Sequence, residues 1–153
     1  MAIMVDSQVR IAGQGGAGLF IEPLVLPPSG PDDALVSGAD ITLLSPDRIV
    51  TYLARQVLPG FARRLATFLS EAAVAEGGPD VPSAFQDPLG GVLIDVTPVD
   101  GMWVEIEVRL VADTQADVVD YDGLNFESTR ASLLVAAQAA QDAFEGLVEM
   151  GGR

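Results

Sequence analysis

Apolar residues in the first half of the chain fall into runs that are separated by clusters of glycine and proline. Residues 3–12, 19–26 and 35–44 are each rich enough in apolar side chains to form a strand. Pro23 lies inside the second run, and a proline within a strand predicts an edge position or a bulge. We therefore expect three strands before residue 45, with loops at residues 13–18 and 27–31.

After these strands the apolar residues follow a helical period. Ser45, Pro46 and Asp47 suit the cap and first turn of a helix. Beyond them an apolar residue recurs at every fourth position, at Ile49, Leu53, Val57, Phe61, Leu65 and Leu69. This stripe predicts a long amphipathic helix, and Pro59-Gly60 predicts a kink in it or a break into two shorter helices.

The second half shows the two-residue alternation of a β-hairpin. Two apolar runs flank Val99-Asp100-Gly101, and an Asp-Gly pair in this position is typical of a hairpin turn. One face of the second run holds Met102, Val104, Ile106, Val108 and Leu110, which we expect in the core, and the other holds Trp103, Glu105, Glu107 and Arg109. A short strand is expected near residues 118–121, and a last amphipathic helix from about Ser128 to Met150.

Both halves therefore consist of strands followed by a helix, which is compatible with a duplicated ββα unit. Glu76 to Pro82 separates them as a linker. The simplest arrangement is an α+β fold in a single domain, residues 1–153, because the length suits one domain. We expect one antiparallel sheet of five to six strands with both helices packed on one face, which buries both apolar stripes.

Composition restricts the chemistry of the chain. It has no cysteine and no histidine, and all eight basic residues are arginine. Thiolate metal sites, cysteine nucleophiles, the usual neutral-pH general base and Schiff-base lysines are therefore excluded. No apolar run is long enough to span a bilayer and no secretory signal is recognisable, so a soluble cytoplasmic protein is expected.

The net charge of −14 opposes binding to nucleic acid and to anionic membranes. It favours a protein partner with a basic surface, although simple solubility explains the charge equally well. Residues 95–127 hold nine carboxylates against Arg109 alone, whereas Arg48, Arg55, Arg63 and Arg64 lie on the first expected helix. A homodimer that pairs this basic helix with the acidic sheet of a second copy is an open alternative.

For three motifs a purely structural interpretation outweighs the functional one. Residues 13–18 match G-x-G-x-x-G, but the prolines that follow forbid a long helix, so a hairpin loop is expected in place of a nucleotide site. The acidic residues at 113–127 lack the spacing of a calcium loop. Asp95, Glu105 and Glu107 lie on an open strand face, where nothing raises the pKa of a general acid.

The site we predict is a surface for a protein partner. It comprises one aromatic residue and six carboxylates, namely Trp103, Glu105, Glu107, Asp113, Asp117, Asp120 and Asp122. A tryptophan on a polar strand face is a typical interface anchor, unless another segment covers it. We expect no catalytic residue, no metal ligand and no cofactor.

The second half resembles the WapI-type immunity-protein-like domains of actinobacteria, small acidic proteins of toxin–immunity loci. The resemblance covers about half of the chain and rests on Phe85-Gln-Asp87-Pro88-Leu89, the hairpin, Asp122-Gly-Leu-Asn-Phe126 and the alanine-rich last helix. It implies an antitoxin-like role by direct binding, without a cofactor. A dimeric secretion chaperone or adaptor, and a phage or structural assembly subunit, are the alternatives to this non-enzymatic role.

Overall fold

A computed structural model describes residues 3–4, 8–27, 36–76, 83–112 and 120–149 of the chain. Sheet A contains β1 (Ile3–Met4), β2 (Val9–Ala12), β3 (Gly18–Leu26), β4 (Val36–Ser45) and β5 (Arg48–Gln56). Sheet B contains β6 (Ser83–Asp87), β7 (Val92–Pro98), β8 (Trp103–Val111) and β9 (Tyr121–Thr129). The helices are α1 (Phe61–Val74) and α2 (Arg130–Glu149), and a short 3-10 turn, η1 (Gln14–Gly16), joins β2 to β3.

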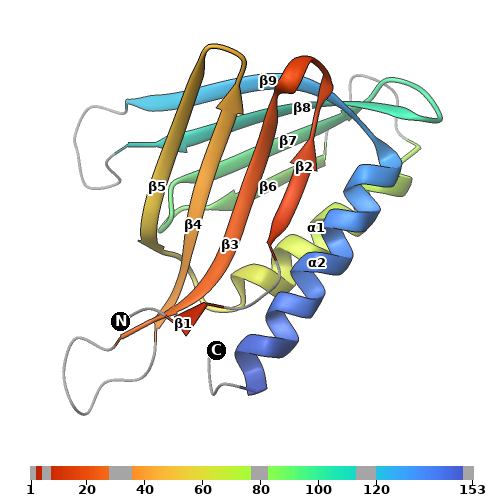
Figure 1. Cartoon of the computed structure of the whole chain (residues 1–153). Coiled ribbons are helices and arrows are strands. Elements are labelled where there is room, and N and C mark those ends of the chain that lie inside the picture. Colours follow the sequence, from red (N-terminus) through yellow and green to blue (C-terminus); the bar gives the residue numbers. More distant parts are fainter. Residues whose placement is uncertain (1–2, 5–7, 28–35, 77–82, 113–119, 150–153) are drawn as a thin grey trace.

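Both sheets are antiparallel, and their strands follow one another in chain order, with β1 and β2 both paired to β3. Sheet A lies in front of sheet B in Figure 1, and their strands cross steeply. The inner faces of the sheets and the helices share one cluster of buried residues. The α+β class is confirmed, but the expected single sheet is wrong because each half builds its own sheet, and the two apolar faces bury each other.

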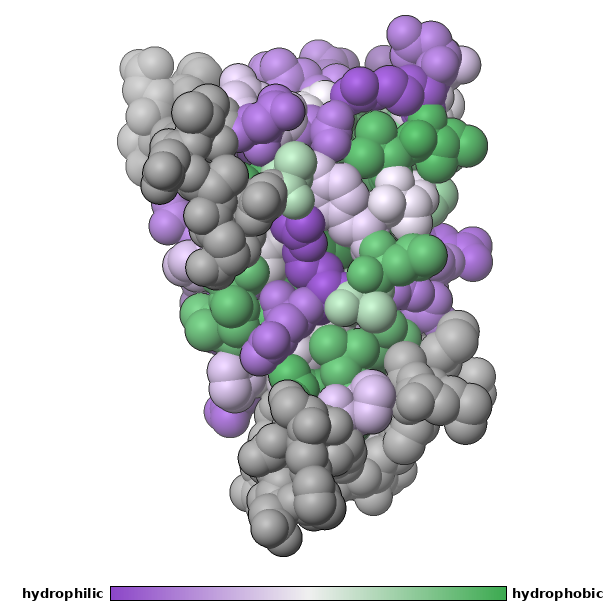
Figure 2. Space-filling model, turned by 90° about the vertical axis from the view of Figure 1, so that its left-hand side faces the viewer, coloured by the Kyte–Doolittle hydropathy of each residue, from purple (hydrophilic) through white to green (hydrophobic). Residues whose placement is uncertain are grey.

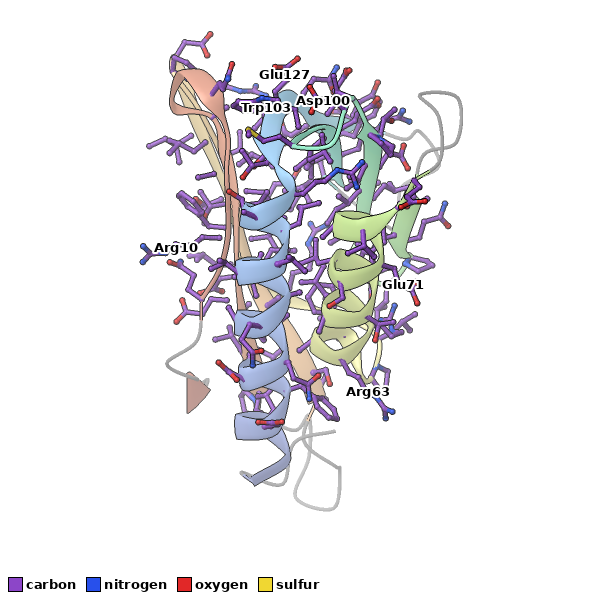
Figure 3. The ribbon with its side chains drawn as sticks, turned by 90° about the vertical axis from the view of Figure 1, so that its right-hand side faces the viewer. Arg10, Arg63, Glu71, Asp100, Trp103 and Glu127 are labelled. Atoms are coloured by element: carbon purple, nitrogen blue, oxygen red, sulfur yellow. The ribbon has the colours of Figure 1, made fainter. Side chains whose placement is uncertain are left out.

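The two helices lie side by side along one flank of the sheets (Figures 1 and 3). Each helix packs against the sheet of the other half: α1 contacts β6, and α2 contacts β2 and β3. Phe85 of β6 lies against Phe61 and Phe68 of α1, with ring centroids 5.7 and 5.6 Å apart. The two halves are therefore interlocked, and each consists of an antiparallel sheet, of five strands in the first half and four in the second, followed by a helix.

The segment predicted as the start of the first helix is a strand hairpin. Ser45 pairs with Arg48 across a two-residue turn, and the Ser45 hydroxyl donates to Asp47 at 3.0 Å. Ser, Pro and Asp suit such a turn as well as a helix cap, and the following Ile49-Val50-Thr51-Tyr52 is rich in residues that favour strands. Ile49 and Leu53 are exposed, so the helical stripe is real only from Phe61 onwards.

Pro23 was expected at an edge position or a bulge, but β3 is paired on both sides and Pro23 lies in regular register opposite Ala39 of β4. On one side, β3 pairs with β2 from Gly18 to Ile21 and with β1 at Leu24 and Val25. Pro23, which has no amide hydrogen to donate, lies between them. The strand at 36–45, the 92–111 hairpin and the last helix are confirmed, except that Met102 is exposed and not in the core. The linker at residues 77–82 and most of the strand predicted near 118–121 lie outside the described residues.

A buried carboxylate fixes α1 to sheet B. Asp87, at the end of β6, is fully buried and lies 2.7 Å from the guanidinium of Arg64 on α1. It also accepts hydrogen bonds from the backbone amides of Gly90 at 2.8 Å and Leu58 at 3.1 Å. The three donors belong to different segments: Leu58 precedes α1, Arg64 is on α1, and Gly90 is in the turn between β6 and β7. The Asp87 carboxylate therefore connects all three segments.

Replacing Arg64 with alanine would leave the Asp87 carboxylate buried without its cation. We expect R64A to lower the free energy of unfolding by about 2 kcal/mol, a value reduced for the partial exposure of Arg64. R63A removes the neighbouring arginine, whose guanidinium carbon lies 5.8 Å from the centroid of the Phe144 ring on α2, and should lower stability by less than about 1 kcal/mol. Urea denaturation of both variants checks this, and equal losses would contradict the role of Asp87.

Candidate protein-binding site

The outer face of sheet B gathers charged and aromatic side chains. Alternation along β7, β8 and β9 directs every second residue away from the core. Besides Leu93, Val111 and Thr129, this set comprises the residues called the acidic face below: Asp95, Thr97, Trp103, Glu105, Glu107, Arg109, Tyr121, Gly123, Asn125 and Glu127. Glu105, Asn125 and Glu127 are exposed, so the centre of this face is open to solvent.

The strand register places carboxylates directly opposite one another. Asp95 on β7 faces Glu107 on β8, and Glu105 on β8 faces Glu127 on β9. Like charges in directly opposed positions destabilise a sheet. Arg109 is the one basic residue of the acidic face, and its guanidinium binds Glu107. Arg109 also attracts Asp95, whereas Glu105 and Glu127 have no arginine partner among the described residues, so the repulsion within this second pair is not offset.

Aromatic residues lie at both ends of this charged region. Trp103 is half-buried at the start of β8, diagonal to Glu127, and Figure 3 shows both near the same end of the molecule. Asp100 accepts hydrogen bonds from the amides of Met102 and Trp103, both at 2.7 Å, which fixes the turn before Trp103 and lowers the pKa of Asp100. At the other end, Tyr121 is exposed beneath Arg109, whose guanidinium carbon lies 5.9 Å from the ring centroid.

A shallow hollow of about 330 Å³ lies beside Tyr121. Glu107, Arg109, Tyr121 and Asn125 form its polar lining, and Gly123, opposite Arg109, leaves its floor without a side chain. The hollow therefore offers an amide, an aromatic ring and a carboxylate that Arg109 already binds.

Two predicted site residues have other positions. Asp122 points to the opposite side of β9, where it accepts a hydrogen bond from the Tyr52 hydroxyl at 2.6 Å and lies 3.4 Å from Arg48. It joins sheet A to sheet B and does not belong to the acidic face. Asp120 is exposed before β9, and Asp113 and Asp117 lie outside the described residues.

The first helix carries only two of the four expected arginines, Arg63 and Arg64. Arg48 and Arg55 belong to β5, and Arg55 donates to the carbonyls of Gly90 and Ala112 at 3.1 and 2.7 Å. Arg130 donates to Ala73 and Ala75 at the end of α1. Most of the described arginines thus bind carbonyl groups or carboxylates of a neighbouring element. Their positive charge is used inside the fold, and the excess negative charge remains on the surface.

The remaining motifs have structural roles. Residues 13–18 form the expected hairpin loop, because β3 and not a helix follows them. A side chain at Gly13 would collide with the Phe126 ring, 2.3 Å from where its Cβ would lie, so this glycine lets the loop pack on β9. Among the described residues, no group of three or more acidic side chains is arranged to hold a metal ion.

The sequence identified Trp103, Glu105 and Glu107 as site residues, and the structure places all three on the acidic face. It placed Asp95 on the same strand face without including it in the site, and it missed Glu127 and Tyr121 as members of this surface. The signal was present in the alternation of β7, but β9 shows no clear alternation of apolar and polar residues at its start, so its register was not readable from the sequence.

Comparison of the chain with known protein families, with curated proteins and with solved structures finds no match. Neither helix in the described part of the chain has the length and apolar character needed to cross a membrane.

Removing one carboxylate from an opposed pair should stabilise the fold. We expect E105Q and E127Q each to raise the free energy of unfolding by about 0.5 kcal/mol at low salt, because each change removes the repulsion between Glu105 and Glu127. The gain should shrink in 1 M salt, where charges are screened. E71Q, on the exposed face of α1, is the matched control; if it gives the same gain, the repulsion is not local to the acidic face.

Tyr52 makes the joint between the sheets sensitive to alkali. Burial and the hydrogen bond to Asp122 raise the pKa of Tyr52 from 10.0 to about 12. The folded state therefore holds this proton more tightly, and its contribution to stability is present below pH 10 and lost as the pH rises to 12. Y52F should cost about 1 kcal/mol at neutral pH and show a smaller decline from pH 10 to 12, measured by thermal unfolding. An unchanged alkaline decline would contradict this role.

Proposed function

We propose that this chain is a non-enzymatic, cytoplasmic protein-binding domain that neutralises a basic partner by docking it on the acidic face. The proposal rests on one observation: carboxylates lie directly opposite each other at two places on this face, Asp95 with Glu107 and Glu105 with Glu127. A sheet face shaped only by stability would place opposite charges or neutral residues across from each other. Retained repulsion of this kind is relieved when a positively charged surface covers it.

The side chains of the acidic face suit arginine and lysine of a partner. Carboxylates form charge-assisted hydrogen bonds with guanidinium groups, and the Trp103 and Tyr121 rings bind cations through their faces. Trp103 can also supply the large, nearly rigid contact area that is typical of interface anchors. The hollow beside Tyr121 has room for one such side chain.

An immunity or antitoxin-like role agrees with this chemistry. Proteins that act on nucleic acid present basic surfaces, and an acidic domain that covers such a surface blocks access by charge and by bulk. The resemblance of residues 85–89 and 122–126 to immunity-protein-like domains supports the same role. The partner class that follows is a basic toxin, bound without a cofactor.

The proposal is tested by capture from a lysate of the native host with immobilised protein, followed by mass spectrometry. The double variant E105K/E127K reverses the central charges, and E71K/E145K makes the same change in net charge on α1 and α2. We expect a basic protein to be retained by the wild type and by E71K/E145K and to be lost with E105K/E127K.

Purified partner should then bind about tenfold or more weakly when salt rises from 50 to 200 mM, because the contact is charge-dominated. Retention by E105K/E127K, or an affinity that does not change with salt, would overturn the proposal.

A further inference from the structure

The outer face of sheet B becomes apolar at the end where β7 turns into β8. Val99 follows β7 and continues its register with β8, because its amide donates to the carbonyl of Trp103 at 3.0 Å. The alternation along β7 therefore directs Val99 outward, beside Trp103 and on the same face as Thr97. Val99 is 51% exposed, Met102 in the turn is 62% exposed, and Trp103 is half-buried. The side chains of Val99, Met102 and Trp103 are called the apolar end below.

Hydrogen bonds hold the backbone of the apolar end in place. Within the turn, the Asp100 carboxylate accepts from the amides of Met102 and Trp103, both at 2.7 Å. Arg130, the first residue of α2, donates from its amide to the carbonyl of Met102 at 2.9 Å. Its guanidinium also donates to the carbonyl of Asp100 at 3.0 Å. The turn is thus fixed within itself and to α2, so covering its apolar side chains costs little further backbone freedom.

The carboxylates around the apolar end determine the charge of the segment that can cover it. Glu105 follows Trp103 by two residues on the same face, and Glu127 lies opposite Glu105 on β9. Figure 3 shows Asp100, Trp103 and Glu127 gathered at one end of the molecule. These three carboxylates outnumber Arg130, whose guanidinium donates to three backbone carbonyl groups beside the turn. A second copy of this chain, with net charge −14, would add repulsion here, whereas a basic segment is attracted.

We propose that the apolar end binds an apolar side chain of the basic partner, next to an arginine or lysine held by the Glu105–Glu127 pair. This inference rests on the proposed function of the acidic face and adds what the partner must carry. Trp103 and Glu105 are two residues apart on one strand, a distance of roughly 7 Å. An extended partner segment spans the same distance between every second residue. The recognised pattern is therefore an apolar residue two positions from a basic one, in an extended segment.

Two peptides of equal charge test this pattern. One repeats Arg-Arg-Leu three times, and the other has serine in place of each leucine. Trp103 is the only tryptophan of the chain, so its fluorescence reports contact at the apolar end. Calorimetry at low salt should show the leucine peptide binding about tenfold more tightly than the serine peptide, because apolar area is buried. The leucine peptide should also shift the Trp103 emission to shorter wavelengths, and the serine peptide should not.

Two double variants locate the contact. V99T/M102Q makes the apolar end polar. I49T/L53Q makes a similar change on β5, where the two side chains are 67% and 73% exposed. Figure 2, which views the molecule from the side of β5, shows hydrophobic surface there, and Figure 1 shows β5 at the opposite side of the molecule from the turn between β7 and β8. I49T/L53Q should keep the preference for the leucine peptide, whereas V99T/M102Q should bind both peptides as weakly as the wild type binds the serine peptide.

The outcomes separate this inference from the proposed function. Equal binding of the two peptides by the wild type, a preference that V99T/M102Q retains, or its loss in both double variants would overturn the apolar end and leave the acidic face standing. E105Q/E127Q should weaken the binding of both peptides, because it removes the carboxylates that hold the arginines. Binding of neither peptide by the wild type would overturn the inference together with the proposed function.

Discussion

The packing of each helix against the sheet of the other half is the constraint on which the rest of the structure depends. α1 follows sheet A in the chain but meets β6, and α2 follows sheet B but meets β2 and β3. Asp87 and the phenylalanine cluster fix the first of these contacts, and Arg130 connects the start of α2 to the end of α1. Because the helices fill one flank and the inner faces of the sheets bury each other, the outer faces of both sheets are left for other uses.

The two outer faces differ in chemistry. Sheet B presents carboxylates whose repulsion is only partly offset by Arg109, flanked by Trp103 and Tyr121. Sheet A presents the exposed apolar side chains of Ile49 and Leu53 on β5, with the Asp40 carboxylate bound to the Ala54 amide next to Leu53. The opposed carboxylate pairs of the acidic face and these exposed apolar side chains thus lie on different sheets. The arginines add little positive charge to either surface because most of them bind carbonyl groups and carboxylates between elements.

Sequence patterns predicted the second half better than the first. The strict alternation from Val92 to Leu110 has one interpretation, and the hairpin and its faces follow from it. Residues 45–56 were misread because Ser-Pro-Asp suits a helix cap and a tight turn equally, and because Ile49, Leu53 and Val57 continue the four-residue period of α1 by coincidence. Asp122 was assigned to the surface since its pairing with Tyr52, 70 residues away, leaves no local signal. The acidic face could be predicted for β7 and β8, but not for β9, whose register depends on its pairing with β8.

The central claim is that the exposed carboxylates of sheet B meet the partner directly. Carbodiimide labelling of carboxylates, read by mass spectrometry with and without the captured basic protein, measures this contact residue by residue. The account predicts that labelling of Glu105 and Glu127 falls several-fold in the complex, whereas labelling of Glu71 on α1 and Glu145 on α2 does not change. Unchanged labelling at Glu105 and Glu127 in a stable complex would contradict it.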